Sequence, residues 1–281
     1  MKAPDFSYRR PETLEEALGI LNDPEADALP LAGGQSLIPM MNFRVAGPET
    51  LVDLNGIEKL QGISVENGEI RIGAMTRYAD LARSREIAEH VPLIGLALPN
   101  IAHAAIRNRG TIGGSIALAD PAAEMPAVAL ALGASIHVEG PDGARTVAAD
   151  DFFLGMYETD LDEGELVTAV SIPLQAAGDR FAFYELARRH GDYAMVGVAV
   201  ATAGSPRIEA CRIVFFGVSD RAVRATGAEQ ALRGTFSGEG IPTAIAALSD
   251  LPCEGDLNAA AETKRYLASV VLRRALEGFG E

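Results

Sequence analysis

The alternation of apolar and polar positions predicts short, interleaved helices and strands over the first 175 residues. Thr13 and Glu16 fit a capping box, and the apolar residues that follow recur at helical spacing. Residues 63–74 alternate around Asn67-Gly68, which is the strongest short hairpin signal. Further strands are expected over 27–34, 49–57, 134–140 and 165–174, and further helices over 76–90, 92–108 and 120–133.

The remainder of the chain has a different pattern of apolar and polar residues, which begins after a stretch of small and polar residues at 175–179. Three strand-like segments with alternating or continuous apolar character come first, and three helical patterns follow. A run of strands followed by a run of helices is typical of an α+β arrangement. We therefore expect two domains, residues 1–175 and residues 179–281.

Composition and charge narrow the class of protein. The chain has 281 residues, of which 48% are hydrophobic, so it is globular and large enough for two domains. Its net charge of -15 argues against a nucleic-acid surface, which needs clustered Lys and Arg. Its apolar runs are too short to cross a bilayer, and its first residues lack a signal-peptide core. We expect a soluble cytoplasmic protein.

The residues that most often bind metals are few. Cys211 and Cys253 are the only cysteines, and two ligands cannot complete a structural zinc or iron–sulfur site. We expect both to be buried thiols. The four histidines are scattered and show no metal-binding spacing; of these, His103 and His190 are the best candidates for a general base. No metal site and no catalytic triad are predicted on this chain.

Two glycine-rich turns are the strongest candidates for a ligand-binding site. The first is "LAGGQSL", from Leu31 to Leu37, and the second is "NRGTIGGS", from Asn108 to Ser115. Glycine permits positive φ and close approach of a ligand, and successive backbone N–H groups in such turns bind phosphate. Hydroxyl and amide side chains in both turns add donors. Each turn alone is compatible with an ordinary tight turn, and neither the G-x-G-x-x-G fingerprint nor a P-loop is present.

Both segments resemble a known family. "LAGGQSLIPMMNFRVAGPETLVDLNGI" is similar to the first flavin-binding segment, and "IRNRGTIGGSIALADPAAEMPAVALALGA" to the second, of the FAD subunits of molybdenum hydroxylases. This family includes the medium subunit of aerobic carbon monoxide dehydrogenase and the FAD domain of xanthine dehydrogenase. The resemblance runs from "FSYRRPETLEEAL" to the C-terminal helices. It implies a vanillyl-alcohol oxidase-like FAD-binding domain with lobes of about 1–56 and 57–175, followed by a carbon monoxide dehydrogenase flavoprotein-type domain.

The resemblance also implies which residues bind FAD. The diphosphate would lie on the two glycine turns, Glu124 would reach the adenosine side, and Tyr193 would lie beside the isoalloxazine ring. Asp120 would instead cap the helix that follows it. The implied FAD-binding residues are Leu31, Ala32, Gly33, Gly34, Gln35, Ser36, Leu37, Ile101, Gly110, Thr111, Ile112, Gly113, Gly114, Ser115, Glu124, Leu166, Val167 and Tyr193.

The chain departs from the family at two places. Many members have Asn after "TIGG", where this chain has Ser115, and many carry a Lys before the "RR" step, where this chain has "YELARR". A serine hydroxyl still donates a hydrogen bond but reaches less far than an amide. The missing lysine removes a positive charge that would tune a flavin potential. Arg188 and Arg189 are expected to be solvated.

The function implied is electron relay. A large molybdopterin-binding subunit would oxidise the substrate, a small [2Fe–2S] subunit would pass electrons to FAD on this chain, and a terminal acceptor would receive them. The assembly would be a heterotrimer or a dimer of heterotrimers. Relatives act on carbon monoxide, purines, N-heterocycles, aldehydes and acyl-CoA thioesters, and use quinone, NAD or oxygen. Two alternatives stay open: a stand-alone FAD-dependent oxidoreductase, and a binding module that has lost the flavin.

Overall fold

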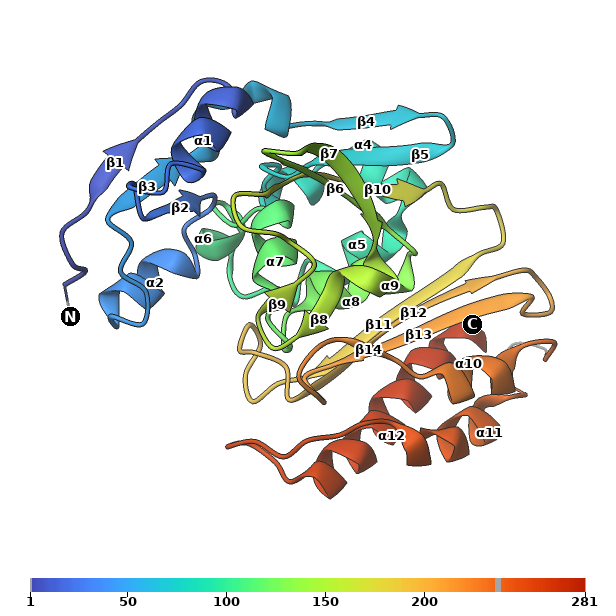
Figure 1. Ribbon diagram of the computed structural model, residues 1–281. Helices are drawn as coiled ribbons and strands as arrows, with labels where there is room; N and C mark the ends of the chain where they lie inside the picture. Colours follow the sequence, from blue (N-terminus) through green and yellow to red (C-terminus); the bar gives the residue numbers. More distant parts are fainter. Residues whose placement is uncertain (1, 236–238, 281) are drawn as a thin grey trace.

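The N-terminal part is a small parallel sheet with two helices (Figure 1). The computed structural model describes residues 2–235 and 239–280. The three strands have the spatial order β1-β3-β2 and all run parallel. Its elements are β1 (Ser7–Arg9), α1 (Leu14–Leu21), β2 (Ala28–Leu31), α2 (Leu37–Asn42), β3 (Thr50–Asp53), η1 (Leu54–Gly56) and η2 (Glu58–Leu60).

The start of α1 shows how local sequence sets these boundaries. The Thr13 hydroxyl accepts a hydrogen bond from the Glu16 amide at 3.2 Å, as the predicted cap requires. The Glu16 carboxylate returns to the amide of Glu12 at 3.0 Å, one residue before the position expected in a capping box. The cap is therefore confirmed with a shifted second hydrogen bond.

A five-stranded antiparallel sheet forms the centre of the molecule, with the order β4-β5-β10-β6-β7. Asn67 and Gly68 have φ of 52° and 81°, the positive values that a type I′ hairpin turn needs, so the predicted hairpin is confirmed. The strands are β4 (Ile63–Glu66), β5 (Glu69–Gly73), β6 (Ser135–Gly140), β7 (Gly143–Ala148) and β10 (Leu166–Pro173).

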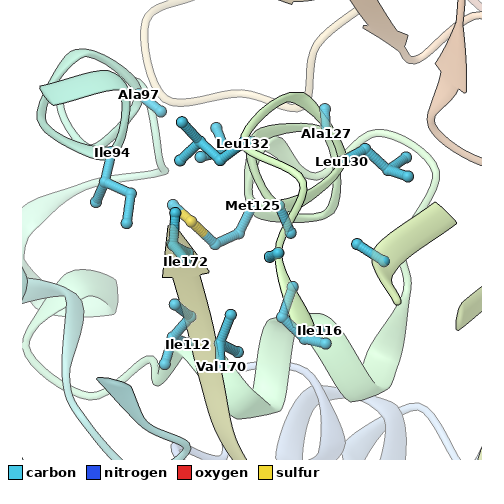
Figure 2. Close-up of a cluster of buried hydrophobic side chains, with 14 of the residues drawn as sticks. Ile94, Ala97, Ile112, Ile116, Met125, Ala127, Leu130, Leu132, Val170 and Ile172 are labelled. Carbon is cyan, nitrogen blue, oxygen red and sulfur yellow. The ribbon is translucent and has the colours of Figure 1, made fainter. Parts of the chain in front are cut away.

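Short helices lie beside this sheet, and Figure 2 shows part of the main core that most of them build with it. Val170 and Ile172 of β10 meet Ile112, Ile116 and Met125 from two of these helices. The helices are α3 (Tyr78–Leu81), α4 (Arg85–His90), α5 (Pro92–Ala97), α6 (Ala104–Arg107), α7 (Ile112–Leu118), α8 (Glu124–Ala131) and α9 (Ala149–Phe152), and a small hairpin follows of β8 (Phe153–Gly155) and β9 (Glu158–Thr159).

Helix α8 is buried on all sides, because it lies between α5 and α7 on one side and the C-terminal sheet on the other. This position explains why its sequence is apolar all round rather than amphipathic.

The C-terminal sheet is antiparallel, with the order β11-β12-β13-β14. Helices α5 and α8 pack on one face of it, and the C-terminal helices cover the other face (Figure 1). The elements are β11 (Arg180–Leu186), β12 (Val196–Ala203), β13 (Ala210–Phe216), β14 (Val223–Arg224), α10 (Thr226–Leu232), α11 (Ile241–Ala246), η3 (Ala247–Asp250), α12 (Ala261–Glu277) and η4 (Gly278–Gly280).

The predicted α+β fold is confirmed, with several differences in detail. The strands β1, β7, β8, β9 and β14 and the helices α2 and α9 were not predicted, because all but β7 and α2 have four residues or fewer and β7 is mostly exposed. The second glycine turn follows the end of α6, as expected, but it also opens α7, which was not predicted. Asp120 does not cap α8, because the N-cap position belongs to Ala123. None of the helices in the described part of the chain combines the length and the apolar character needed to cross a membrane.

Candidate functional site

Two glycine-rich loops meet at the N-terminal end of α7. The first glycine loop (residues 31–37) runs from β2 into α2, and the second glycine loop (residues 110–115) opens α7. A Cβ atom added at Gly33 would lie 2.9 Å from the Cα atom of Gly110, and closer still to the carbonyl oxygen of Arg109. No side chain fits at that distance, so glycine is required at this contact. The fold thus joins the two motifs that the sequence singled out.

The first glycine loop keeps its main-chain donors available. The amide N–H groups of residues 33–37 have no acceptor within the described part of the chain. Gly34 has a left-handed φ of 71°, whereas the backbone of Ser36 is in the right-handed helical region. The Ser36 side chain makes no capping hydrogen bond to α2. Consecutive N–H groups in such mixed conformations converge into a concave anion-binding nest. This loop therefore presents a row of hydrogen-bond donors that suits a phosphate group.

The second glycine loop uses its donors internally. The amides of residues 112 and 113 donate to the carbonyl oxygens of Thr76 and Ala74, at 3.1 and 2.8 Å. The amides of residues 114 and 115 both donate to Thr111, one to its hydroxyl and one to its carbonyl oxygen, each at 3.2 Å. These four amides are committed to the protein itself, unlike the symmetric arrangement expected from sequence. What this loop offers a ligand is its close packing and its side chains.

A polar clasp of Asp53, Asn55 and Arg77 ties the two loops together. The Asn55 side-chain amide donates to the carbonyl oxygen of Ala32, in the first loop, at 3.1 Å. The Arg77 guanidinium donates to the carbonyl oxygen of Arg109, beside the second loop, and to the Asn55 side-chain oxygen. Asp53 accepts the Asn55 main-chain N–H at 3.0 Å and fixes its position. Sequence reasoning missed this clasp, because its members come from separate segments.

Carboxyl and phenol groups gather near the start of α8. The Asp120 carboxylate accepts hydrogen bonds from the amide of Ala122 at 2.9 Å and from the hydroxyl of Tyr157 at 3.4 Å. The Tyr193 hydroxyl lies close enough to Asp120 for the two groups to shift each other's pKa. Burial, with the negative charge of Asp120 adding to it, raises the pKa of Glu124 to about 7. We call Asp120, Glu124, Tyr157, Tyr193 and the residue described next, Glu185, the carboxyl–tyrosine cluster.

Glu185 is the member that sequence reasoning missed. It lies on β11, and its Oε2 atom is buried without a hydrogen-bond partner in the described part of the chain. Burial raises its pKa to about 8, and the negative charge of Glu124 contributes to the shift. The available signal was "RFAFYEL", in which a glutamate takes the third place on a strand face that begins with two phenylalanines.

Tyr78 connects this cluster to the second glycine loop. Its ring is buried, its hydroxyl lies near the Ser115 side chain, and Glu124 lies within electrostatic range. Burial raises the pKa of Tyr78 well above its usual value, so the phenol stays protonated. The Ser115 side chain, which stands where many relatives have Asn, therefore lies beside a protonated phenol.

The other residues expected to bind FAD are divided between the cores. Ile101 and Val167 are buried in the main core. Leu166 is buried in a second, smaller core, which it forms with residues of α1 and β3, and Ala32 of the first loop also packs against this core. Tyr193 is 68% exposed, so most of its ring faces solvent rather than packing in a core.

Other candidate side chains lie away from these features. The exposed ones are His103, His190, Arg188 and Arg189. Cys211 and Cys253 are free thiols and only half-buried, where full burial was expected. Burial nevertheless raises the pKa of Cys211 to about 12, so this thiol stays protonated.

The arrangement fits an extended nucleotide cofactor such as FAD. The nest of free amides suits a diphosphate, which an acidic protein could otherwise not attract. The orphaned oxygen of Glu185 needs a polar partner that the described chain does not supply. An anion receptor and an unsatisfied polar group are thus both present for such a cofactor.

Comparison with known proteins identifies the relatives of this chain. Residues 4–175 match the family model described as the FAD binding domain in molybdopterin dehydrogenase. Residues 181–279 match the CO dehydrogenase flavoprotein C-terminal domain.

Individual relatives match over nearly the whole chain. The carbon monoxide dehydrogenase medium chain of Hydrogenophaga pseudoflava is 40% identical over 98% of this chain and 97% of its own length. Caffeine dehydrogenase subunit beta of Pseudomonas sp. (strain CBB1) is 37% identical over 98% of this chain and 95% of its own.

Solved structures agree with these sequence matches. The carbon monoxide dehydrogenase of Hydrogenophaga pseudoflava superposes with a TM-score of 0.95 at 41% identity, covering 99% of this chain and 98% of the matched one. Quinoline 2-oxidoreductase from Pseudomonas putida 86 gives a TM-score of 0.93 at 38% identity, with the same coverage. The chain therefore belongs to the family of FAD-binding medium subunits of molybdenum hydroxylases, and it is the flavoprotein subunit of an oxidoreductase.

Proposed function

We propose that this chain relays electrons, through FAD, from the iron–sulfur clusters of a small partner subunit to a terminal acceptor. The observation that carries the proposal is the nest of free amides at residues 33–37, held against a second glycine loop in a chain of this family. Bound FAD supplies the redox chemistry, because a flavin exchanges electrons either singly or in pairs. The task of this chain is to bind, orient and shield that group.

We propose that the first glycine loop holds the diphosphate and that the second acts as the rigid wall behind it. Gly33 permits the contact between the loops, and the clasp through Asn55 and Arg77 fixes their separation. A preorganised receptor of this kind lowers the entropy cost of ordering the loop when the cofactor binds. FAD would run from this receptor, with residues 1–175 as its binding domain and residues 179–281 as the second domain.

The carboxyl–tyrosine cluster would serve one end of the cofactor. Glu124 was assigned to the adenosine side and Tyr193 to the isoalloxazine, but Glu124 contributes to the electrostatic environment of Tyr193. Groups this near each other belong at the same end of an extended FAD. We propose that both face the flavin end, where the exposed ring of Tyr193 would cover the isoalloxazine.

The partners would be a large molybdopterin-binding subunit and a small [2Fe–2S] subunit. Carbon monoxide dehydrogenase and nicotine 6-hydroxylase relatives are named as medium chains or subunits, which implies such assemblies. We propose a heterotrimer or a dimer of heterotrimers in the cytoplasm. Substrate oxidation would occur on the large subunit, so this chain needs no general base of its own.

Reconstitution with FAD tests the proposal. The purified chain is incubated with FAD, desalted and scanned for bound flavin absorbance, and candidate substrates are then added anaerobically with and without the partner subunits. Relay predicts bound flavin that bleaches only when both partners are present. Bleaching by substrate with this chain alone would instead establish a stand-alone oxidoreductase, and failure to bind FAD would establish a module without flavin.

A further inference from the structure

The register of β11 directs Glu185 toward the interior of the molecule. Phe181 and Phe183 pack against the main core, whereas Ala182 and Tyr184 pack against the core under the C-terminal helices. Because side chains alternate along a strand, Glu185 shares the face of the two phenylalanines. Its carboxyl group therefore lies between the C-terminal sheet and the FAD-binding part of the chain.

The neighbours of Glu185 on this face provide little polar compensation. The adjacent strand places Gly197 opposite it, and a Cβ atom there would collide with the Phe216 ring. Helix α5, which packs on β11, has no titratable side chain, and neither has β12. The charged helix α12 packs on the opposite face of the sheet, where Arg274 donates to the Tyr184 hydroxyl at 2.6 Å.

Glu124 is the titratable group that acts on Glu185, and the other members of the cluster are reached through it. Glu124 lies at the start of α8 and interacts in turn with Asp120 and Tyr193, while the Tyr157 hydroxyl joins the cluster by donating to Asp120. None of these groups is a cation that could stabilise a second buried carboxylate. Negative charge at Glu185 would also add to the overall repulsion of the negatively charged FAD by a chain that already has a net charge of -15.

A neutral carboxyl resolves both conflicts. A protonated carboxyl group carries no charge and gains an O–H donor, so it can satisfy a ligand oxygen as well as its own orphaned atom. The same Oε2 atom is buried and lacks a partner in the described part of the chain. Buried polar groups are nearly always hydrogen-bonded, which points to a ligand as the missing partner.

We infer that the protonated carboxyl group of Glu185 donates a hydrogen bond to bound FAD, so that FAD affinity falls when this carboxyl ionises. The inference rests on the proposed function, and it concerns a residue outside both glycine loops. Binding of FAD takes up a proton wherever the free chain holds Glu185 ionised. No covalent or redox step is involved.

The pH dependence of FAD affinity tests this role. Because burial raises the pKa of Glu185 to about 8, wild-type affinity is expected to be constant up to pH 7 and to fall about tenfold per unit well above pH 8. Glu185→Gln keeps a side-chain donor that cannot ionise, so its affinity should match wild type at pH 6.5 within about threefold and stay flat to pH 9.5. Glu185→Leu, which lacks the donor, should bind about tenfold more weakly at pH 6.5 and also be flat.

Two further variants sharpen the result. Glu66→Gln, an exposed glutamate on β4, is the matched control and should keep the wild-type profile. Glu124→Gln removes the neighbouring negative charge, so the fall in affinity should begin at lower pH whatever its absolute affinity. Calorimetry at pH 8.5 in two buffers of different ionisation enthalpy should show proton uptake on FAD binding by wild type and none by Glu185→Gln.

The outcomes separate this inference from the proposed function. A wild-type chain that binds no FAD at any pH refutes the proposed function. A wild-type chain that binds FAD with a flat profile, or a Glu185→Gln variant that retains the wild-type fall, refutes only the role of Glu185. Far-UV circular dichroism and thermal melts of each variant exclude misfolding as the cause of weaker binding.

Discussion

The two glycine loops are similar in sequence but use their main-chain donors in opposite ways. Both contain two consecutive glycines and a nearby serine. The first leaves five consecutive amides without acceptors in the described part of the chain, while the second gives the amides of residues 112–115 to Thr76, Ala74 and Thr111. This difference supports the proposal that the first loop is the receptor and the second a support. Composition alone cannot distinguish the two roles, because distant carbonyl groups decide them.

Disrupting the contact between the two glycine loops should cause the largest loss of FAD affinity. Gly33→Ala places a Cβ atom against Arg109 and Gly110, so the loops must separate. We expect FAD affinity to fall by more than a hundredfold and the free energy of unfolding to fall by about 1–3 kcal/mol. Bound-flavin absorbance and chemical denaturation measure the two effects. Gly95→Ala, in an exposed turn of α5 with open space around it, is the control and should be neutral or stabilising by about 0.5–1 kcal/mol.

Disrupting the clasp should cause the second-largest loss of FAD affinity. Asn55→Ala removes the hydrogen bond to Ala32 and the acceptor for Arg77, so the loops lose their fixed separation. FAD should bind about tenfold more weakly, equivalent to about 1.4 kcal/mol. Arg77→Lys keeps the positive charge but cannot bridge Arg109 and Asn55 with a planar fork, so it should show a similar loss. Full affinity in Arg77→Lys would show that charge, rather than geometry, matters at this position.

The supporting loop should respond mainly in stability. Thr111→Val removes the hydroxyl that accepts the Gly114 amide and caps α7. We expect a loss of about 1 kcal/mol in the free energy of unfolding, as for other N-cap substitutions, with FAD affinity reduced only a fewfold. Thermal melts without and with FAD separate these contributions. A large loss of affinity at unchanged stability would mean that Thr111 contacts the cofactor directly.

A substitution in the first glycine loop should lower FAD affinity and leave stability unchanged, and its effect should be the smallest of the four. Ser36 makes no cap to α2, so Ser36→Ala should leave the melting temperature of the FAD-free chain unchanged. If its hydroxyl supplements the main-chain nest, FAD affinity should fall by about twofold to fivefold. Titration of FAD fluorescence measures this difference. A fall in stability would contradict the division of roles between the loops.

Local sequence signals predicted most of the fold. The Asn67-Gly68 hairpin, the Thr13 cap and the strand-rich C-terminal part each follow from a few neighbouring residues. Strand β7 escaped prediction because its sequence, "GARTVA", begins with glycine and exposes most of its residues.

The site was less predictable, because tertiary contacts set its properties. The glycine loops were visible in the sequence, but the capture of the second loop's amides depends on Thr76 and Ala74, which come from another segment. Glu185 was hidden for the same reason. A glutamate in a strand is ordinary until the fold turns its face inward and leaves its oxygen without a partner.

Amide-resolved hydrogen exchange with and without FAD tests the division between the loops most directly. The amides of residues 33–37 have no acceptor in the described part of the chain, and those of residues 112–115 are already bonded. On FAD binding, we predict that exchange slows at least tenfold across residues 33–37, while residues 112–115, protected from the start, change much less. Unchanged exchange in the first loop, with new protection confined to the second, would contradict the account.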